Sequence, residues 1–134
     1  MRKVDLDMLY DTDLNTWVKI SGETVIIGIT DWTQNIIGNV KFIYLSSLIN
    51  DMIIRNMLLC ELESDKATTE ITSPISGVLI NFNPLIFDSP SLINKECYTS
   101  GWIVKLKLIE NSQLDQLLPA EKYKEAIDSF FKKS

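Results

Sequence analysis

The stretch LESDKATTEITSP, residues 62–74, places a polar turn between two strand-forming segments. Leu62 closes the apolar run MLLCEL, and a second segment rich in β-branched residues begins near Thr68. The polar residues between them, from Glu63 to Ala67, predict a tight hairpin turn. Lys66 is therefore expected near the tip of a β-hairpin.

A lysine on such a turn is protonated at neutral pH and is a poor nucleophile. The neighbouring carboxylates of Glu63, Asp65 and Glu70 favour its charged form further. These features disfavour a Schiff-base or general-base role for Lys66. A hairpin tip does leave the amine open to a modifying enzyme that acylates it and removes the charge. Because lysines are common in turns, position alone predicts only a solvated side chain.

Outward from the hairpin, most of the chain has the residue pattern of short strands. Alternating or β-branched runs separated by turn residues predict the following strands: TVIIGIT (24–30), VKFIYL (40–45), MLLCEL (57–62), GVLINF (77–82) and GWIVKLKLIE (101–110). These runs predict a mainly β protein, and a length of 134 residues suits a single domain.

Two segments have helical signals instead. Thr30 or Asp31 can cap a short helix over TDWTQNII, and Gly38 can end it. Near the C-terminus, Ser112 can cap a helix over QLDQLL, and Pro119 suits the first turn of a longer helix. Apolar residues of that longer helix recur at helical spacing and predict packing on the sheet: Tyr123, Ala126, Ile127, Phe130 and Phe131.

The composition excludes several classes of function. The chain has 13 basic and 18 acidic residues and a net charge of −5, which argues against nucleic acid or an anionic membrane as the main partner. There is no histidine, so histidine-activated nucleophiles and histidine metal ligands are excluded. Cys60 and Cys97 are far apart and are expected to be reduced thiols. No secretory signal is evident, and a cytoplasmic location is expected.

The residues around Lys66 resemble the lipoyl-attachment hairpin of lipoyl domains, in which Asp-Lys-Ala marks the modified lysine. Biotin carriers place Met on both sides of the lysine, whereas Asp65 and Ala67 stand there in this chain. Over nearly its whole length, the chain looks like the H protein of the glycine cleavage system. The matching segments, in order, are WVK (17–19), GITDWTQNIIG (28–38), ES (63–64), SPISG (73–77), SPSLIN (89–94), Tyr98, GWIVK (101–105) and QLDQLLPAEKY (113–123).

This resemblance implies a lipoyl-domain fold, a barrel-sandwich hybrid of two small sheets with a short helix in the N-terminal half and a C-terminal helix. It implies one domain over residues 1–134 that is a carrier and not an enzyme. Lipoate is expected in amide linkage to Lys66, within an attachment turn of Glu63, Ser64, Asp65, Ala67 and Glu70. The implied partners are a lipoate ligase or transferase, glycine dehydrogenase, an aminomethyltransferase and dihydrolipoamide dehydrogenase.

The chain departs from the family pattern at the cleft that shelters the loaded arm. The family has His-Glu where this chain has Asn15 and Thr16, and that Glu helps to hold the aminomethyl group. A position on the short helix that is often polar is Ile36 here. Thr16, Trp32 and Ile36 are therefore the candidate cleft residues. A cationic cargo needs hydrogen-bond acceptors, so this cleft is less suited to an amine.

These departures leave several interpretations open. The chain can be the aminomethyl carrier of glycine cleavage, or an H-like lipoate-binding protein of sulfur oxidation that works beside a heterodisulfide-reductase-like complex. An unmodified scaffold or regulatory protein is a further alternative, although nothing structural requires a lysine at position 66. An independent enzyme is disfavoured, because the sequence offers no catalytic base, activated nucleophile or metal site.

Overall fold

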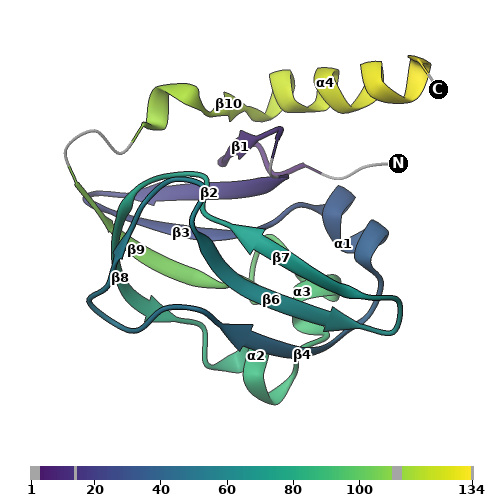
Figure 1. The fold of residues 1–134 in the computed structure, drawn as a ribbon. Helices are drawn as coiled ribbons and strands as arrows, with labels where there is room; N and C mark the ends of the chain where they lie inside the picture. The colour runs from purple at the N-terminus through teal and green to yellow at the C-terminus, as the bar shows by residue number, and fades with distance from the viewer. Residues whose placement is uncertain (1–3, 14, 110–112, 134) are drawn as a thin grey trace.

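The computed structural model describes residues 4–13, 15–109 and 113–133, without the side chains of residues 130–133 (Figure 1). In chain order its elements are β1 (Leu9–Asp11), β2 (Thr16–Ser21), β3 (Thr24–Ile29), α1 (Asp31–Ile37), β4 (Val40–Leu45), β5 (Met52–Ile53), β6 (Leu58–Ser64), β7 (Thr68–Thr72), β8 (Gly77–Phe82), α2 (Leu85–Asp88), α3 (Leu92–Lys95), β9 (Val104–Leu108), a 3-10 turn (Leu114–Gln116), β10 (Leu118–Pro119) and α4 (Ala120–Lys133). The mainly β prediction is confirmed.

The larger sheet has seven antiparallel strands in the order β10-β1-β2-β3-β9-β8-β5. In its β2–β3 hairpin, Trp17 stands opposite Gly28. A Cβ atom at Gly28 would lie 2.5 Å from the Trp17 ring, so only glycine leaves room for the indole. The indole nitrogen donates a hydrogen bond of 2.9 Å to the carbonyl of Cys97, which ties the chain after α3 to this sheet.

The smaller sheet has three antiparallel strands in the order β4-β6-β7 and covers one face of the larger sheet (Figure 1). Cys60, Leu62 and Ile71 of the smaller sheet share one buried core with Ile27 and Leu106 of the larger. Both sheets therefore bury one side-chain face between them, which is the sandwich that the sequence pattern and the family resemblance predict.

Helix α4 packs across β1 and β10 at the edge of the larger sheet (Figure 1). The ring of Tyr123 stacks on that of Tyr10, with centroids 4.5 Å apart. The Tyr123 hydroxyl lies 3.0 Å from Asn15 Oδ1 and 3.0 Å from Thr30 Oγ1. The helix predicted after Pro119 is confirmed. Through Tyr123 it contacts both Tyr10 in β1 and Thr30 at the start of α1.

The helix predicted over QLDQLL is wrong. That segment makes a single 3-10 turn and then the two-residue strand β10, because Leu118 and Pro119 pair with Tyr10 and Leu9 in the sheet. Ser112 and the side chains of Phe130 and Phe131 lie outside the described residues.

Local signals placed α1 correctly. Thr30 Oγ1 accepts a hydrogen bond of 3.3 Å from the Thr33 amide and caps the helix. Gly38 ends it with φ of +80°, a conformation that favours glycine. The predicted strands 40–45 and 77–82 coincide with β4 and β8. Within the described part of the chain, no helix combines the length and apolar character needed to cross a membrane.

Candidate functional site

The β6–β7 hairpin projects from the smaller sheet beside α1 (Figure 1). Glu63 pairs with Thr68 as the last antiparallel partners before the turn. Strand β6 continues through Ser64, two residues into the segment predicted as turn. The turn itself therefore consists of residues 65–67, and Lys66 lies in it as the sequence predicts.

Ser64 holds the turn closed. Its backbone amide donates to the carbonyl of Ala67 at 2.9 Å. Its hydroxyl donates to the same carbonyl at 3.2 Å and accepts from the amides of Lys66 at 3.2 Å and Ala67 at 3.4 Å. A short serine side chain thus bonds two amides and one carbonyl of the turn from inside. These bonds constrain the backbone at Lys66, although the residue itself is exposed.

The aliphatic part of Lys66 lies against the end of α1. A Cβ atom at Gly38 would be 3.4 Å from both Cδ and Cε of Lys66, so the missing side chain at Gly38 leaves a smooth surface for these methylenes. Among the described residues, no ion pair includes Lys66. The side chain is therefore held at its stem, and its amine remains accessible.

Asn94 of α3 supports the turn between α1 and β4 on which Lys66 rests. Its Nδ2 donates to the Gly38 carbonyl at 2.7 Å, and its Oδ1 accepts from the Val40 amide at 2.9 Å. One amide thereby satisfies a donor and an acceptor that the helix end leaves exposed. Sequence reasoning did not identify this role. The sequence feature that could have indicated it is the family-like segment SPSLIN, which ends at Asn94.

Acidic side chains lie on the hairpin that carries Lys66. Asp65 lies 3.9 Å from Lys41, with both side chains largely exposed. Glu63 accepts a hydrogen bond of 3.3 Å from the exposed Tyr44 hydroxyl. Glu70 stands opposite Glu61 across β6 and β7, a like-charge pairing that is unfavourable in a sheet. Exposed ion pairs contribute little to folding, so these charges are not needed for the hairpin.

The candidate cleft residues do not share one environment. Thr16 is fully buried, and its hydroxyl has no hydrogen-bond partner among the residues that the structure describes. Its side chain consequently does not reach the surface. Ile36 is 55% exposed on α1. Trp32 is half-buried and forms one wall of a pocket.

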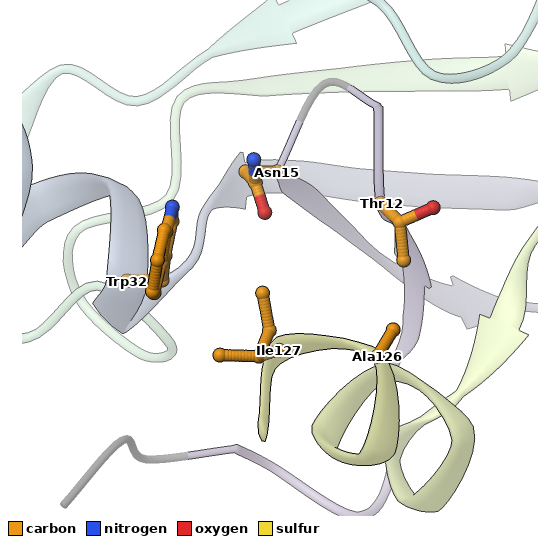
Figure 2. A pocket seen from close by; sticks show the side chains of 5 residues that line it. All are labelled: Thr12, Asn15, Trp32, Ala126 and Ile127. Carbon is orange, nitrogen blue, oxygen red and sulfur yellow. The ribbon is translucent and has the colours of Figure 1, made fainter. Parts of the chain in front are cut away.

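That pocket lies between the β1–β2 loop, α1 and α4, and Figure 2 shows the side chains around it. Its volume is about 240 Å³. It is lined by Thr12, Asn15, Trp32, Ala126 and Ile127, none of which carries a charge. Across the described residues, no group of three or more histidine, cysteine or acidic side chains is arranged to hold a metal ion.

Comparison with known proteins agrees with this geometry. The family model for the glycine cleavage H-protein matches residues 8–130. The chain belongs to the glycine cleavage H-protein family. Glycine cleavage system H proteins of Aliivibrio fischeri and Staphylococcus carnosus are 36% and 40% identical to it; the alignments cover 93% and 83% of this chain and 98% and 87% of those relatives. The crystal structure of a glycine cleavage system H protein from Mycobacterium marinum matches with a TM-score of 0.81 and 23% identity, covering 93% of this chain and 99% of that one.

Membership of the H-protein family defines the cofactor and the class of activity. H proteins carry a covalently attached lipoate and act as carriers, not as catalysts. The predictions of a lipoyl carrier and of its fold are thereby confirmed. The two curated relatives described above are both named for glycine cleavage and neither for sulfur oxidation.

The residues at the hairpin tip fit such a group. Lys66 is exposed, no ion pair of the described residues ties its amine, and Gly38 presents no side chain to its stem. Acylation of this amine would break no contact on which the fold depends.

Proposed function

We propose that Lys66 is the lipoyl-attachment residue of this H protein, and that the chain, as one domain over residues 1–134, is the aminomethyl carrier of glycine cleavage. The observation that carries the proposal is the state of Lys66 itself. Its backbone is fixed by the Ser64 hydroxyl, while its amine has no ion pair among the described residues. A modifying enzyme requires a lysine whose backbone position is defined and whose amine makes no contact that the fold needs.

Each residue of the attachment turn has a distinct part in this proposal. Ser64 keeps the turn in one conformation, so that every partner meets Lys66 at the same place. Gly38 supports the stem of the lysine without blocking it. When bound, lipoate supplies a disulfide that opens to two thiols and can carry a group between enzymes. Acylation removes one positive charge, which takes the net charge of the chain from −5 to −6.

The partners follow from this carrier role. A lipoate ligase or transferase attaches the group, glycine dehydrogenase loads it, an aminomethyltransferase unloads it, and dihydrolipoamide dehydrogenase reoxidises it. All of them must reach the same amine, which a projecting hairpin allows. Glu63, Asp65 and Glu70 place negative charge on the same hairpin as that amine and suit partners whose entrances are basic.

Sulfur transfer beside a heterodisulfide-reductase-like complex is the second candidate, and one observation favours it. Thr16 is buried and Ile36 is apolar and exposed, so neither position presents a polar group to a cationic cargo at the surface. An unmodified scaffold is disfavoured, because Lys66 has no structural role that would retain it.

The test begins with lipoylation of the purified chain by a lipoate ligase, followed by peptide mass analysis. A mass increase confined to the peptide containing Lys66, and absent in Lys66→Arg, is expected. The lipoylated protein is then assayed for glycine–carbon dioxide exchange with glycine dehydrogenase, beside a lipoylated relative of known activity. Exchange at a comparable rate supports the aminomethyl carrier. Modification of Lys66 without exchange refutes the glycine role and leaves sulfur transfer, and failure to modify Lys66 refutes both.

A further inference from the structure

The segment 48–57 presents apolar side chains to solvent at one edge of the larger sheet. Strand β5 lies within this segment and is the last strand of that sheet, paired with β8. Ile53 of β5 is buried, so its neighbours on either side face outward, as alternation along a strand requires. Each of the five residues that form this edge patch exposes between 39% and 73% of its surface: Leu48, Ile49, Met52, Ile54 and Met57.

Two hydrogen-bonded turns hold the edge patch in one shape. In the first turn, the Asp51 amide donates to the Leu48 carbonyl at 3.0 Å, and the Asp51 carboxylate accepts from the Leu48 amide at 2.8 Å. In the second turn, the Met57 amide donates to the Ile54 carbonyl at 2.8 Å. An asparagine with positive φ stands at the third position of each turn, where that conformation is needed. The apolar side chains therefore project from a defined backbone.

The charges of the segment are already engaged within the chain. Asp51 accepts from an amide of its own turn, and Arg55 forms the 2.8 Å ion pair with Asp11. Lys107 stands in the same cross-strand row as Met52 but two strands away, at about 10 Å, where it belongs to a polar rim. An apolar surface without a free charge at its centre is complementary to a second copy of itself.

The area of the edge patch is sufficient for a weak but specific dimer. Its five side chains expose roughly 300 Å² of apolar surface, given about 120 Å² for a whole side chain of this kind. Patches of that size are often binding sites. Because interfaces are only about 57% apolar, this patch corresponds to about 500 Å² on each copy and about 1,000 Å² for the pair. Specific interfaces begin near that size.

We propose that two copies of this chain associate through the edge patch across a two-fold axis, so that each copy covers the patch of the other. Met57 precedes β6 and the turn with Lys66 follows it, and the seven residues of that strand put about 20 Å between them (Figure 1). The dimer therefore leaves Lys66 of both copies open and carries two attachment sites. Association itself does not depend on the proposed attachment at Lys66.

Sedimentation equilibrium of the full chain tests this contact. Between about 5 μM and about 1 mM protein, the mean mass should rise from 15.3 kDa toward twice that value, with half of the chains paired at about 10–100 μM. Because each copy has a net charge of −5, raising NaCl from about 0.05 M to about 0.5 M should strengthen the dimer. A mass of 15.3 kDa at every concentration, or a dimer that salt dissociates, overturns the proposal.

Substitutions identify the surface that pairs. Leu48→Lys should raise the Kd of the dimer at least tenfold, because each dimer loses two leucine contacts and brings two like charges together. Met52→Lys is a second variant and should act in the same direction. The matched control is Leu85→Lys, at a leucine that is 52% exposed on α2 beyond the far end of β8, and it should leave the Kd unchanged. Equal weakening by Leu48→Lys and Leu85→Lys contradicts the edge patch.

Lipoylation separates this question from the role of Lys66. Lys66→Arg should dimerise as the unaltered chain does, and Leu48→Lys should be lipoylated at an unchanged rate. A chain that is lipoylated at Lys66 but stays monomeric refutes the dimer and leaves the carrier proposal intact. If Leu48→Lys then raises the KM of glycine dehydrogenase for the lipoylated protein and Leu85→Lys does not, the edge patch belongs to that enzyme instead of a second copy.

Discussion

Replacing Asn94 with alanine tests the support beneath the attachment turn. In the structure its amide joins the Gly38 carbonyl, at 2.7 Å, to the Val40 amide, at 2.9 Å. Two longer contacts run to Gln34, at 3.4 Å to its Oε1 and 3.5 Å to its carbonyl oxygen. Alanine removes both short bonds and leaves two backbone groups in a half-buried turn without this partner. The end of α1 and the start of β4 then lose the side chain that holds them together.

The expected loss of stability follows from those two bonds. A hydrogen bond contributes about 1 kcal/mol net, and a partly desolvated group without a partner adds a further penalty, so Asn94→Ala should lower the free energy of unfolding by about 2–3 kcal/mol. For a domain of this size that corresponds to a fall of roughly 10 °C in Tm. Because net stabilities are about 5–15 kcal/mol, the variant should still fold.

Urea denaturation followed by circular dichroism measures this effect. The midpoint should fall while the slope of unfolding free energy against urea stays unchanged. Asn35→Ala is the matched control, since Asn35 is an exposed amide on α1 whose contact with Asp31 is 3.4 Å long. Asn94→Asp keeps an acceptor for Val40 but faces the Gly38 carbonyl with a second acceptor, so it should be at least as destabilising as alanine. The reasoning is refuted if Asn94→Ala and Asn35→Ala have the same midpoint.

Two further predictions concern buried groups. Arg55→Met removes the 2.8 Å ion pair with Asp11, whose side chain is only 3% exposed. The free energy of unfolding, measured by urea denaturation, should fall by about 3 kcal/mol. The control Lys122→Met loses an exposed pair of 3.7 Å with Glu125 and should change the free energy of unfolding by less than about 0.5 kcal/mol. Burial raises the pKa of the Cys60 thiol from 9.0 to about 12. The folded protein therefore keeps a proton that the unfolded chain releases, and stability should fall as the pH rises through this window, by up to about 1.4 kcal/mol per pH unit from this group. Midpoints measured from pH 8 to 11 should show a smaller decline in Cys60→Ala, and an identical decline would contradict this origin.

The features that the sequence predicted correctly are those set by neighbouring residues. Thr30 and Gly38 mark the ends of α1, because a cap depends on one side chain and one backbone conformation. The hairpin around Lys66 follows from a polar turn between two strand-forming runs. Such local rules place Lys66 on a hairpin turn without any knowledge of the rest of the chain.

The features that sequence reasoning missed depend on residues far apart in the chain. Asn94 supports a turn more than 50 positions earlier, and no local pattern links the two segments. The QLDQLL segment has helical spacing, yet Leu118 forms sheet bonds with Tyr10 because β1 offers a free edge. Thr16 also belongs to this group, since only the assembled sandwich decides that its side chain points into the interior.

The exposed apolar character of Ile36 bears on the cargo of this carrier. A residue with 55% of its surface in water contributes little to the core, so its replacement by a polar residue should change stability little. Glycine exchange by the lipoylated protein would mean that the loaded amine is accommodated without a polar group at Ile36. Lipoylation of Lys66 without exchange would mean that the apolar face of α1 suits a carrier whose cargo is uncharged, which is the condition that sulfur transfer meets.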